Sequence, residues 1–559
     1  MKSVSNIKKT WWKEGIVYQI YPRSYKDTTG NGVGDIYGII EKLDYIKSLG
    51  VDIIWLCPVY ESPNDDNGYD ISDYRKISED FGGDEVFDIL ITQMHQKGLK
   101  LVMDLVLNHS SDEHFWFEEA RKSKDNPYRD YYFWKPAKDN KPPNNWMSFF
   151  KGSVWDWDET TKEYYLHLFT KKQPDLNWEN PKVRQEIQDI VEFWCKKGVD
   201  GFRMDVISLI SKQLKFPNSP YPEDYGKTIT NYYANGPKIH QYLNELNQKV
   251  LSKYDIMTVG EGPGINLNNG LDYVDERRNE LSMIFHFDHL FIDNGAGGKY
   301  DPIPVTLSKF KKVFGDWDEK LKGRGWGSIF LGNHDFSRMV SRFGNDENYR
   351  EASAKLLAML LLTMRGTVYI YQGDEIGMTN VAYDSIEDYN DIETLGNWNE
   401  AKAQGKDMNV FMTLVHMQSR DNARTPMQWN TSKNAGFSDG QPWLKVNPNY
   451  SKINVASQEN DPNSILNFYR RMIAFRKEND VMVYGEYECL NETDEQLYIY
   501  KRWNGQESYI ILLNFSDNIQ YINHIELNLG NTELLISNSN ENASISELQP
   551  WEAQLRAYK

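Results

Sequence analysis

The chain has 559 residues, of which 40% are hydrophobic, so it is long enough for about three or four domains with substantial cores. Lys and Arg number 63 and Asp and Glu number 81, which gives a net charge of −18. This negative charge argues against nucleic acids and anionic membrane surfaces as partners, and it suits solubility and a neutral substrate.

Short apolar runs rich in β-branched and aromatic residues recur along the chain, and each ends in polar residues. They cover 16–21, 51–58, 99–108, 199–206, 256–261, 281–286, 326–334 and 367–372. Amphipathic helical patterns that end at or near a glycine precede the second, third and fourth runs, at 36–50, 84–100 and 183–198. Continuous apolar strands that alternate with helices indicate a parallel sheet covered on both faces. We therefore predict an α/β fold, a (β/α)8 barrel rather than an open doubly wound sheet.

Three segments depart from this alternation. Residues 110–173 are polar and rich in Trp, Pro and Lys, and because they are too long for an unstructured loop they predict an inserted small domain after the third strand. Residues 379–425 are expected to form a loop subdomain after the eighth run. From 478 to 559, strand-like runs at 498–503, 508–515, 525–529 and 532–536 predict a C-terminal antiparallel β-sandwich. The barrel itself is expected to cover 1–109 and 174–477.

The cysteines are Cys57, Cys195 and Cys489. Their odd number and wide spacing argue against a disulfide framework and against a zinc site. The first fifteen residues lack the apolar segment of a signal peptide, and the longest apolar stretch, 356–362, is too short to span a bilayer. We expect a cytoplasmic protein that is a monomer or a weak homo-oligomer.

Carboxylates stand at the ends of several predicted strands. Asp205 is at the end of the fourth run, Glu261 ends the fifth, and Asp335 follows the seventh. In a (β/α)8 barrel these ends carry the active site. One such acid alone is usually a helix cap or an ion-pair partner, but burying several together costs free energy unless chemistry uses them. Glycoside cleavage uses one carboxylate as nucleophile and one carboxylic acid as proton donor, about 5–5.5 Å apart in retaining enzymes.

Four strand-end motifs resemble the signature regions of the α-amylase superfamily, glycoside hydrolase family 13, in the same order and over nearly the whole chain. They are DLVLNH (104–109), GFRMDV (201–206), VGEGPG (259–264) and GNHDFSR (332–338). The resemblance implies that Asp205 is the nucleophile, that Glu261 is the general acid/base and that Asp335 binds the ring hydroxyls of the sugar. It also implies that Arg203 orients Asp205 and that two histidines hydrogen-bond sugar hydroxyls, namely His109 and His334.

The resemblance extends to residues that close the far end of a sugar pocket. Asp66 and Tyr69, in DNGYDISDY (66–74), resemble a pair that holds the terminal glucose, with Tyr69 stacked on its ring. Arg424 in RDNARTPMQW (420–429) is implied to pair with Asp66, with Arg420 as the alternative in the same motif. A pocket closed in this way implies exo attack on short chains, whereas the alternative for Asp66 and Arg424 is a structural ion pair.

Finer features favour one branch of the family. The segments QPDLN (173–177) and DNGAGGKYD (293–301) resemble the oligo-1,6-glucosidase subfamily, in which a valine after the nucleophile, here Val206, accompanies α-1,6 preference. Sucrose isomerases share much of this pattern but carry an Arg-rich loop before the seventh strand, which this chain lacks. Gly262 and the pair Phe336-Ser337 depart from the residues common in these glucosidases and leave the linkage preference open.

The expected activity is therefore that of a retaining, exo-acting α-glucosidase on short oligosaccharides, and the resemblance favours substrates of the isomaltose type. The alternatives are a hydrolase directed at sucrose or trehalose (or its phosphate), and a sucrose isomerase or trehalulose synthase. A non-catalytic transporter partner of the same superfamily is disfavoured, because this chain retains all three acids.

The loop 27–35 alternates oxygen-bearing residues with glycines, as tight cation-binding loops do. The resemblance suggests a structural Ca2+ or Mg2+ there, and a metal-free turn remains the alternative. The ligands would be Asp27, Thr29, Asn31, Val33 and Asp35. No catalytic cofactor is expected.

Overall fold

The structure is a computed structural model that describes residues 8–221, 225–522, 529–539 and 543–559. Its main sheet consists of β1 (Ile16–Ile20), β2 (Ile53–Leu56), β5 (Lys100–Val106), β9 (Gly201–Asp205), β10 (Met257–Glu261), β11 (Met283–Phe285), β14 (Ser328–Ile329) and β15 (Thr367–Tyr371). The eight strands follow the order β11-β10-β9-β5-β2-β1-β15-β14. Each of the eight predicted runs contains one of these strands, which confirms the predicted α/β fold with its parallel eight-stranded sheet.

The chain divides into two compact units, which are described separately. The first unit comprises residues 1–54, 288–394 and 401–559, and the second comprises residues 55–287 and 395–400. These limits differ from the predicted domain boundaries because they divide the main sheet within β2. The boundaries predicted from the sequence therefore stay predictions.

In the second unit, the pairing register of the strands places Asp205 and Glu261 at the same end of the sheet. Val106 of β5 pairs with Asp205 of β9, and Gly260 of β10 pairs with Met204, so Asp205 and Glu261 both end their strands. The intervening helices are α4 (Gly83–Gln96), α6 (Pro181–Lys197) and α8 (Ile239–Lys249). Helix α6 begins at a proline after an Asn180 cap and ends at Gly198, whose φ of 103° suits glycine.

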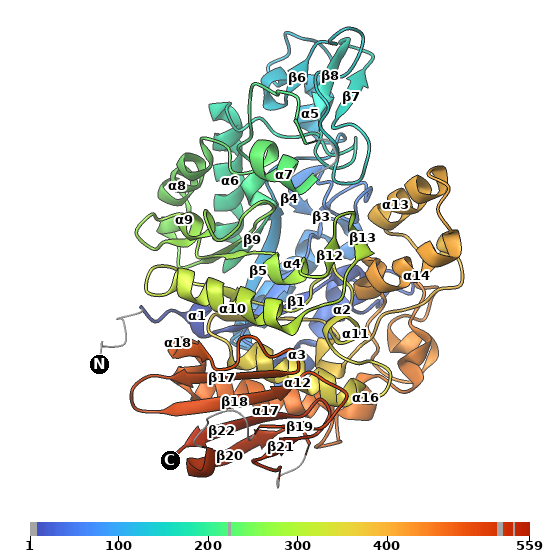
Figure 1. Cartoon of the computed structure of the whole chain (residues 1–559). Coiled ribbons are helices and arrows are strands. Elements are labelled where there is room, and N and C mark those ends of the chain that lie inside the picture. Colours follow the sequence, from blue (N-terminus) through green and yellow to red (C-terminus); the bar gives the residue numbers. More distant parts are fainter. Residues whose placement is uncertain (1–7, 222–224, 523–528, 540–542) are drawn as a thin grey trace. The chain divides into compact units, whose positions relative to one another are not determined.

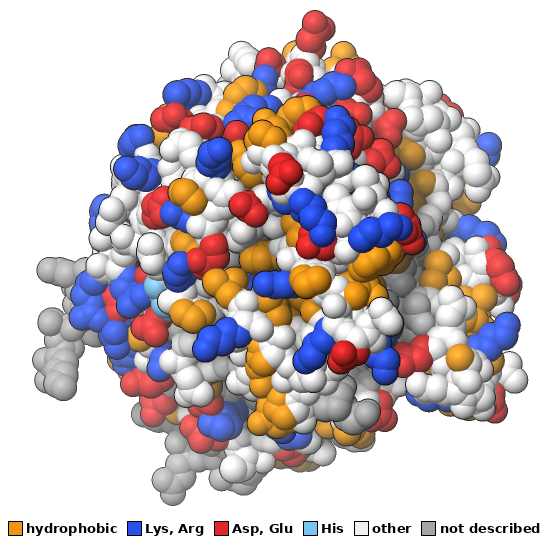
Figure 2. Space-filling view, turned by 90° about the horizontal axis from the view of Figure 1, so that it is seen from above, with side chains coloured by type: hydrophobic (Ala, Val, Ile, Leu, Met, Phe, Trp, Pro, Cys, Tyr) orange, Lys and Arg blue, Asp and Glu red, His pale blue; other side chains and the backbone are white. Residues whose placement is uncertain are grey.

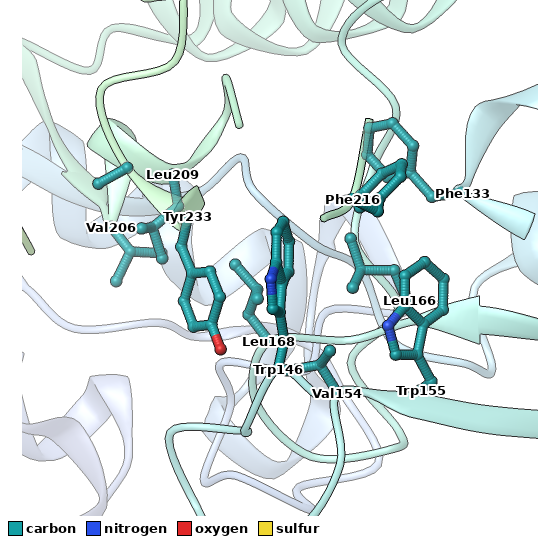
Figure 3. Packing of buried hydrophobic residues seen from close by; sticks show 11 residues of the cluster. Phe133, Trp146, Val154, Trp155, Leu166, Leu168, Val206, Leu209, Phe216 and Tyr233 are labelled. Atoms are coloured by element: carbon teal, nitrogen blue, oxygen red, sulfur yellow. The ribbon is translucent and has the colours of Figure 1, made fainter. Parts of the chain in front are cut away.

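The segment predicted as an inserted domain contains a small antiparallel sheet in the order β6-β8-β7. Its strands are β6 (Trp134–Lys135), β7 (Trp155–Asp158) and β8 (Glu163–Leu166). Side chains from this region, including Trp146, Trp155 and Leu166, form a buried apolar cluster with Val206, the residue after Asp205. Figure 3 shows this cluster, in which Val206 directly follows β9 in the chain and does not belong to the inserted segment.

In the first unit, β1 pairs with β15 in parallel, and the nearly fully buried helix α12 (Arg350–Thr363) precedes β15. The excursion after β15 contains α14 (Met408–Gln418) and the short α15 (Asp421–Arg424). The C-terminal region forms an antiparallel sheet in the order β16-β17-β18-β22-β20 (Figure 1). These strands are β16 (Glu486–Cys489), β17 (Leu497–Trp503), β18 (Ser508–Asn514), β20 (Thr532–Ser537) and β22 (Ala553–Tyr558).

A second, two-stranded sheet pairs β19 (Gln520–Tyr521) with β21 (Glu547–Leu548). A shared apolar cluster contains Leu497 and Ile499 of β17, Ile510 and Leu512 of β18, and Leu548 of β21. The members of this cluster alternate along β17 and β18, but both strands are buried at almost every position, so both faces of the sheet are covered at these strands. Residues 525–528 of the predicted strand 525–529 lie outside the described residues.

Charged side chains of both signs are interspersed over the face drawn in Figure 2. That face therefore offers no extended positive area of the kind that binds a phosphate backbone. Within the described ranges, none of the helices has the length and apolarity needed to cross a lipid bilayer.

Candidate active site

One buried guanidinium joins three carboxylates in the second unit. Arg203 Nη1 donates to Asp205 Oδ1 and to Asp104 Oδ1, both at 2.7 Å, and its Nη2 lies 2.7 Å from Glu261 Oε2. Arg203 is only 1% exposed. The carboxylates come from the adjacent strands β5, β9 and β10. The structure thus brings the predicted nucleophile, the predicted acid/base and the predicted orienting arginine together.

The turn after Asp205 adds a further link between the two acids. Val206 has φ 36° and ψ 38°, a left-handed conformation that is strained for a β-branched residue. Its backbone N–H donates to Glu261 Oε2 at 3.0 Å. The Val206 side chain lies in the apolar cluster with Leu209 and Tyr233 (Figure 3). Packing of this side chain and the hydrogen bond to Glu261 together offset the backbone strain.

Burial and neighbouring charges oppose one another at these acids. Burial raises the pKa of Asp205 well above its usual range, Arg203 lowers it, and the Glu261 and Asp104 carboxylates raise it again. Burial also raises the pKa of Asp104 to about 6, against the lowering effects of Arg203 and Tyr69. Carboxylates this close favour sharing a proton over ionising fully. An ionised carboxylate beside a protonated one is the combination that glycoside cleavage requires.

Asp104 offers a pH test of this arrangement. Its negative charge raises the pKa of Asp205, so the Asp104→Asn substitution should lower that pKa and leave Asp205 ionised at lower pH. We expect the acid limb of the kcat/KM profile, measured on an aryl α-glucoside, to move down by roughly one pH unit. An acid limb that stays in place or moves to higher pH would contradict this coupling.

Three other predicted sugar-binding residues also lie in the second unit. Tyr69 Oη donates to Asp104 Oδ2 at 2.9 Å, and His109 Nε2 lies 3.2 Å from the carbonyl oxygen of Tyr69. Asp66 Oδ2 accepts a hydrogen bond from Gln173 Nε2 at 3.2 Å. Burial lowers the pKa of His109 to about 4, so this histidine is neutral at the pH of ordinary enzyme assays. Hydrogen bonds thus link Tyr69 and His109 to Asp104.

The remaining predicted residues are grouped in the first unit. Asp335 Oδ1 accepts from Arg424 Nη2 at 2.8 Å and from Arg420 Nη1 at 3.4 Å, and its side chain is 25% exposed. Arg424 Nε donates to the carbonyl oxygen of His334 at 2.9 Å, and His334 Nε2 lies 3.2 Å from Asp335 Oδ2. Both candidate arginines therefore contact Asp335. The pairing of Arg424 with Asp66 stays a prediction.

Some residues in these groups were not among the predicted site residues. Asp104 belongs to the first signature motif, so its position near the end of β5 was a usable signal. Gln173 opens the QPDLN segment and contacts Asp66. Asp391 accepts a hydrogen bond from Arg420 Nε at 2.7 Å, but it lies in a polar loop without any pattern that marks it.

The loop 27–35 uses its oxygen atoms as hydrogen-bond acceptors. Asp27 accepts from three backbone N–H groups and from the hydroxyls of Thr29 and Ser438. Asp35 accepts from two backbone N–H groups, and Asn31 Oδ1 accepts from another. Burial opposes ionisation of Asp27, but these hydrogen bonds lower its pKa.

The chain's own donors engage the side-chain oxygens of Asp27, Asn31 and Asp35, which are the atoms that the prediction assigns to a cation. Nowhere in the described ranges do three or more His, Cys, Asp or Glu side chains form a group able to hold a metal ion. Cation binding stays a prediction, and no step of the chemistry uses it.

Gly262 follows the predicted acid/base directly. A Cβ atom built at this position would lie 2.6 Å from Cδ1 of Ile265, closer than van der Waals contact allows. Ile265 therefore fills the space beside the backbone at residue 262. A larger residue at this position would require Ile265 to move.

Comparisons with known proteins agree with the fold. Residues 19–485 match the family model described as alpha amylase, catalytic domain. The chain belongs to this family and is a glycoside hydrolase.

Among individual relatives, it is 54% identical to the oligo-1,6-glucosidase of Parageobacillus thermoglucosidasius, over 99% of both chains. It is 46% identical to the trehalose-6-phosphate hydrolase of Bacillus subtilis (strain 168), over 90% of both chains. A solved structure of an isomaltulose synthase mutant from Erwinia rhapontici NX5, in complex with sucrose, shares 44% identity at a TM-score of 0.94 and covers 99% of this chain and 100% of that one.

Proposed function

We propose that the chain is a retaining, exo-acting α-glucosidase that hydrolyses short α-1,6-linked glucosides through a covalent glycosyl-enzyme intermediate. The observation that carries this proposal is the contact of Arg203 with both Asp205 and Glu261, each at 2.7 Å. Two carboxyl groups held by one guanidinium fit the close pair that retaining enzymes use, whereas inverting enzymes keep the acids about 6.5–9.5 Å apart to admit a water molecule.

In the proposed reaction, the Asp205 carboxylate attacks the anomeric carbon while Glu261 protonates the leaving glycosidic oxygen. Glu261 then removes a proton from water, and the resulting attack releases glucose and restores Asp205. Burial raises the pKa of Asp205, and the Arg203 guanidinium opposes this effect and so favours the ionised nucleophile. Asp335 and the side chains of Asp66, Tyr69, His109, His334 and Arg424 are proposed to bind the hydroxyls and the ring of the same glucosyl residue.

The α-1,6 preference is supported by Val206 and by the relatives named oligo-1,6-glucosidase. A sucrose isomerase is the second candidate, because solved isomaltulose and trehalulose synthases share about 44% identity with this chain. The loop 289–298, HLFIDNGAGG, contains no arginine, whereas the family resemblance associates an Arg-rich loop with sucrose isomerases. This difference favours hydrolysis.

A product profile tests the proposal. Isomaltose, maltose, sucrose and trehalose 6-phosphate would be incubated with the enzyme in parallel, and proton NMR would follow the first-formed sugars. We expect the fastest glucose release from isomaltose, with α-glucose as the initial anomer. Initial β-glucose would refute the retaining mechanism. Formation of isomaltulose or trehalulose from sucrose would show that the enzyme isomerises sucrose and would refute the proposed hydrolysis.

A further inference from the structure

A buried lysine that has no role in the proposed chemistry lies close to the site in the second unit. Lys212 is 1% exposed, and its Nζ lies 2.8 Å from Asp175 Oδ2 and 3.2 Å from Asn108 Oδ1. Asp175 belongs to the QPDLN segment, and Asn108 follows β5. An ammonium group removed from water needs such partners, and Asp175 neutralises its charge.

Asn108 lies between Lys212 and His109 and contacts both side chains. Because Asn108 Oδ1 accepts from the lysine, its amide nitrogen faces His109, with Nδ2 at 3.3 Å from Nδ1 of the ring. An amide nitrogen only donates, so His109 Nδ1 must be an acceptor without a proton. The ring proton then resides on Nε2, which lies 3.2 Å from the carbonyl oxygen of Tyr69, an acceptor.

A second contact of His109 favours the other tautomer of its ring. Gln173 Nε2 also lies 3.2 Å from His109 Nε2, and a donor at that distance favours the opposite tautomer, with the proton on Nδ1. The ring therefore has two possible hydrogen-bonding states. The orientation of Asn108, which Lys212 sets, selects between them.

We propose that Lys212 is a positioning residue that fixes, through Asn108, the Nε2–H tautomer of His109. This N–H donates to the carbonyl oxygen of Tyr69 in the free protein and to a hydroxyl of the bound glucosyl residue in the complex. This inference rests on the proposed α-glucosidase function for its consequence in catalysis. The tautomer itself is a property of the free protein. Burial keeps the ring neutral by lowering the pKa of His109 to about 4, so the choice of tautomer is the choice between donor and acceptor at Nε2.

Two substitutions test the relay at different points. Lys212→Met removes the ammonium group and frees the Asn108 amide to rotate. Asn108→Asp keeps a partner for Lys212 but places an acceptor opposite His109 Nδ1, which draws the ring proton to that nitrogen. We expect each variant to lose about 100-fold in kcat/KM on isomaltose, comparable to other losses of a partner that orients a histidine.

The tautomer is read directly by NMR on protein labelled with 15N at histidine, with the His109 signals assigned from a His109→Gln variant. In the unaltered protein, we expect the Nδ1 shift of an unprotonated nitrogen and the Nε2 shift of a protonated one. In Asn108→Asp, the two should exchange. A merely structural role for Lys212 would change thermal stability without exchanging these shifts.

Lys311→Met is the matched control, because Lys311 is also a buried lysine but donates to the backbone carbonyls of Asn491, Asp494 and Leu497. We expect it to lower the unfolding temperature and to leave kcat/KM and the His109 shifts unchanged.

An Nδ1–H tautomer in the unaltered protein, or unchanged kcat/KM and shifts in Asn108→Asp, would overturn the proposal. If Lys212→Met does not fold, the tautomer in the unaltered protein and its exchange in Asn108→Asp still test the contact of Asn108 with His109. If the unaltered enzyme cleaves no α-glucoside, the proposed function fails, while the 15N shifts still decide the tautomer.

Discussion

We expect Asp205→Asn to lose about four or more orders of magnitude in kcat on every α-glucoside that the enzyme cleaves, as removal of an essential nucleophile does elsewhere. The asparagine amide has nearly the size of the carboxylate, and its oxygen can still accept from Arg203 Nη1, now 2.7 Å from Asp205 Oδ1. It cannot form a stable ester with the anomeric carbon. Glucose release from isomaltose and thermal unfolding, measured on the same preparations, separate lost chemistry from lost folding.

Asp200→Asn is the matched control, at the other end of the same strand. Asp200 precedes β9 at its opposite end and pairs with His95 and Lys100. Its substitution removes an acid of the same type from the same unit without touching the group around Arg203. We expect activity within about twofold of the original enzyme. If Asp205→Asn kept more than about 1% of the original kcat, Asp205 would not be the nucleophile.

The main sheet could be predicted almost completely from the sequence, for a physical reason. Strands of a parallel sheet are covered on both faces, so they read as unbroken apolar runs, and β1, β9 and β15 are buried at every position. The exact ends were less certain. The predicted run 326–334 is far longer than the two-residue strand β14, Ser328–Ile329. Hydrophobic pattern alone does not show where a ladder of hydrogen bonds stops.

The acids of the site were predictable because each stands at the end of an apolar run. The contacts that tune them were not, because they join residues far apart in the chain: Arg203 and Asp104 are 99 positions apart. The left-handed backbone at Val206 carries no sequence signal either, since valine rarely adopts it.

The ambiguity between Arg420 and Arg424 has a geometric explanation. Arg420 is the N-cap of the short helix α15 and Arg424 is its last residue, so the two arginines are four positions apart and emerge on the same side of one helical turn. Both then reach Asp335 Oδ1. A sequence motif that assigns the role to a single arginine cannot predict that two arginines contact the same carboxylate.

Glu261→Gln should give a loss that depends on the leaving group, which distinguishes an acid/base from a nucleophile. Isomaltose needs a proton on its departing oxygen, so we expect kcat/KM to fall by about a thousandfold. A dinitrophenyl α-glucoside needs no such proton, so the first step should slow less than about tenfold, and the glycosyl-enzyme should then accumulate because no base activates water. A burst of dinitrophenol followed by a slow phase would report this accumulation.

Azide then identifies which acid carries the sugar. In Glu261→Gln, azide can attack the anomeric carbon of the glucosyl ester and expel the Asp205 carboxylate, and two inversions in succession yield α-glucosyl azide. The control Glu280→Gln removes a buried glutamate that pairs with His240 and Arg278, and it should behave like the original enzyme on both substrates. If Glu261 were the nucleophile instead, its loss would slow both substrates equally, and any azide product would be the β anomer formed by a single inversion. The anomer therefore assigns the two carboxylates that Arg203 holds together.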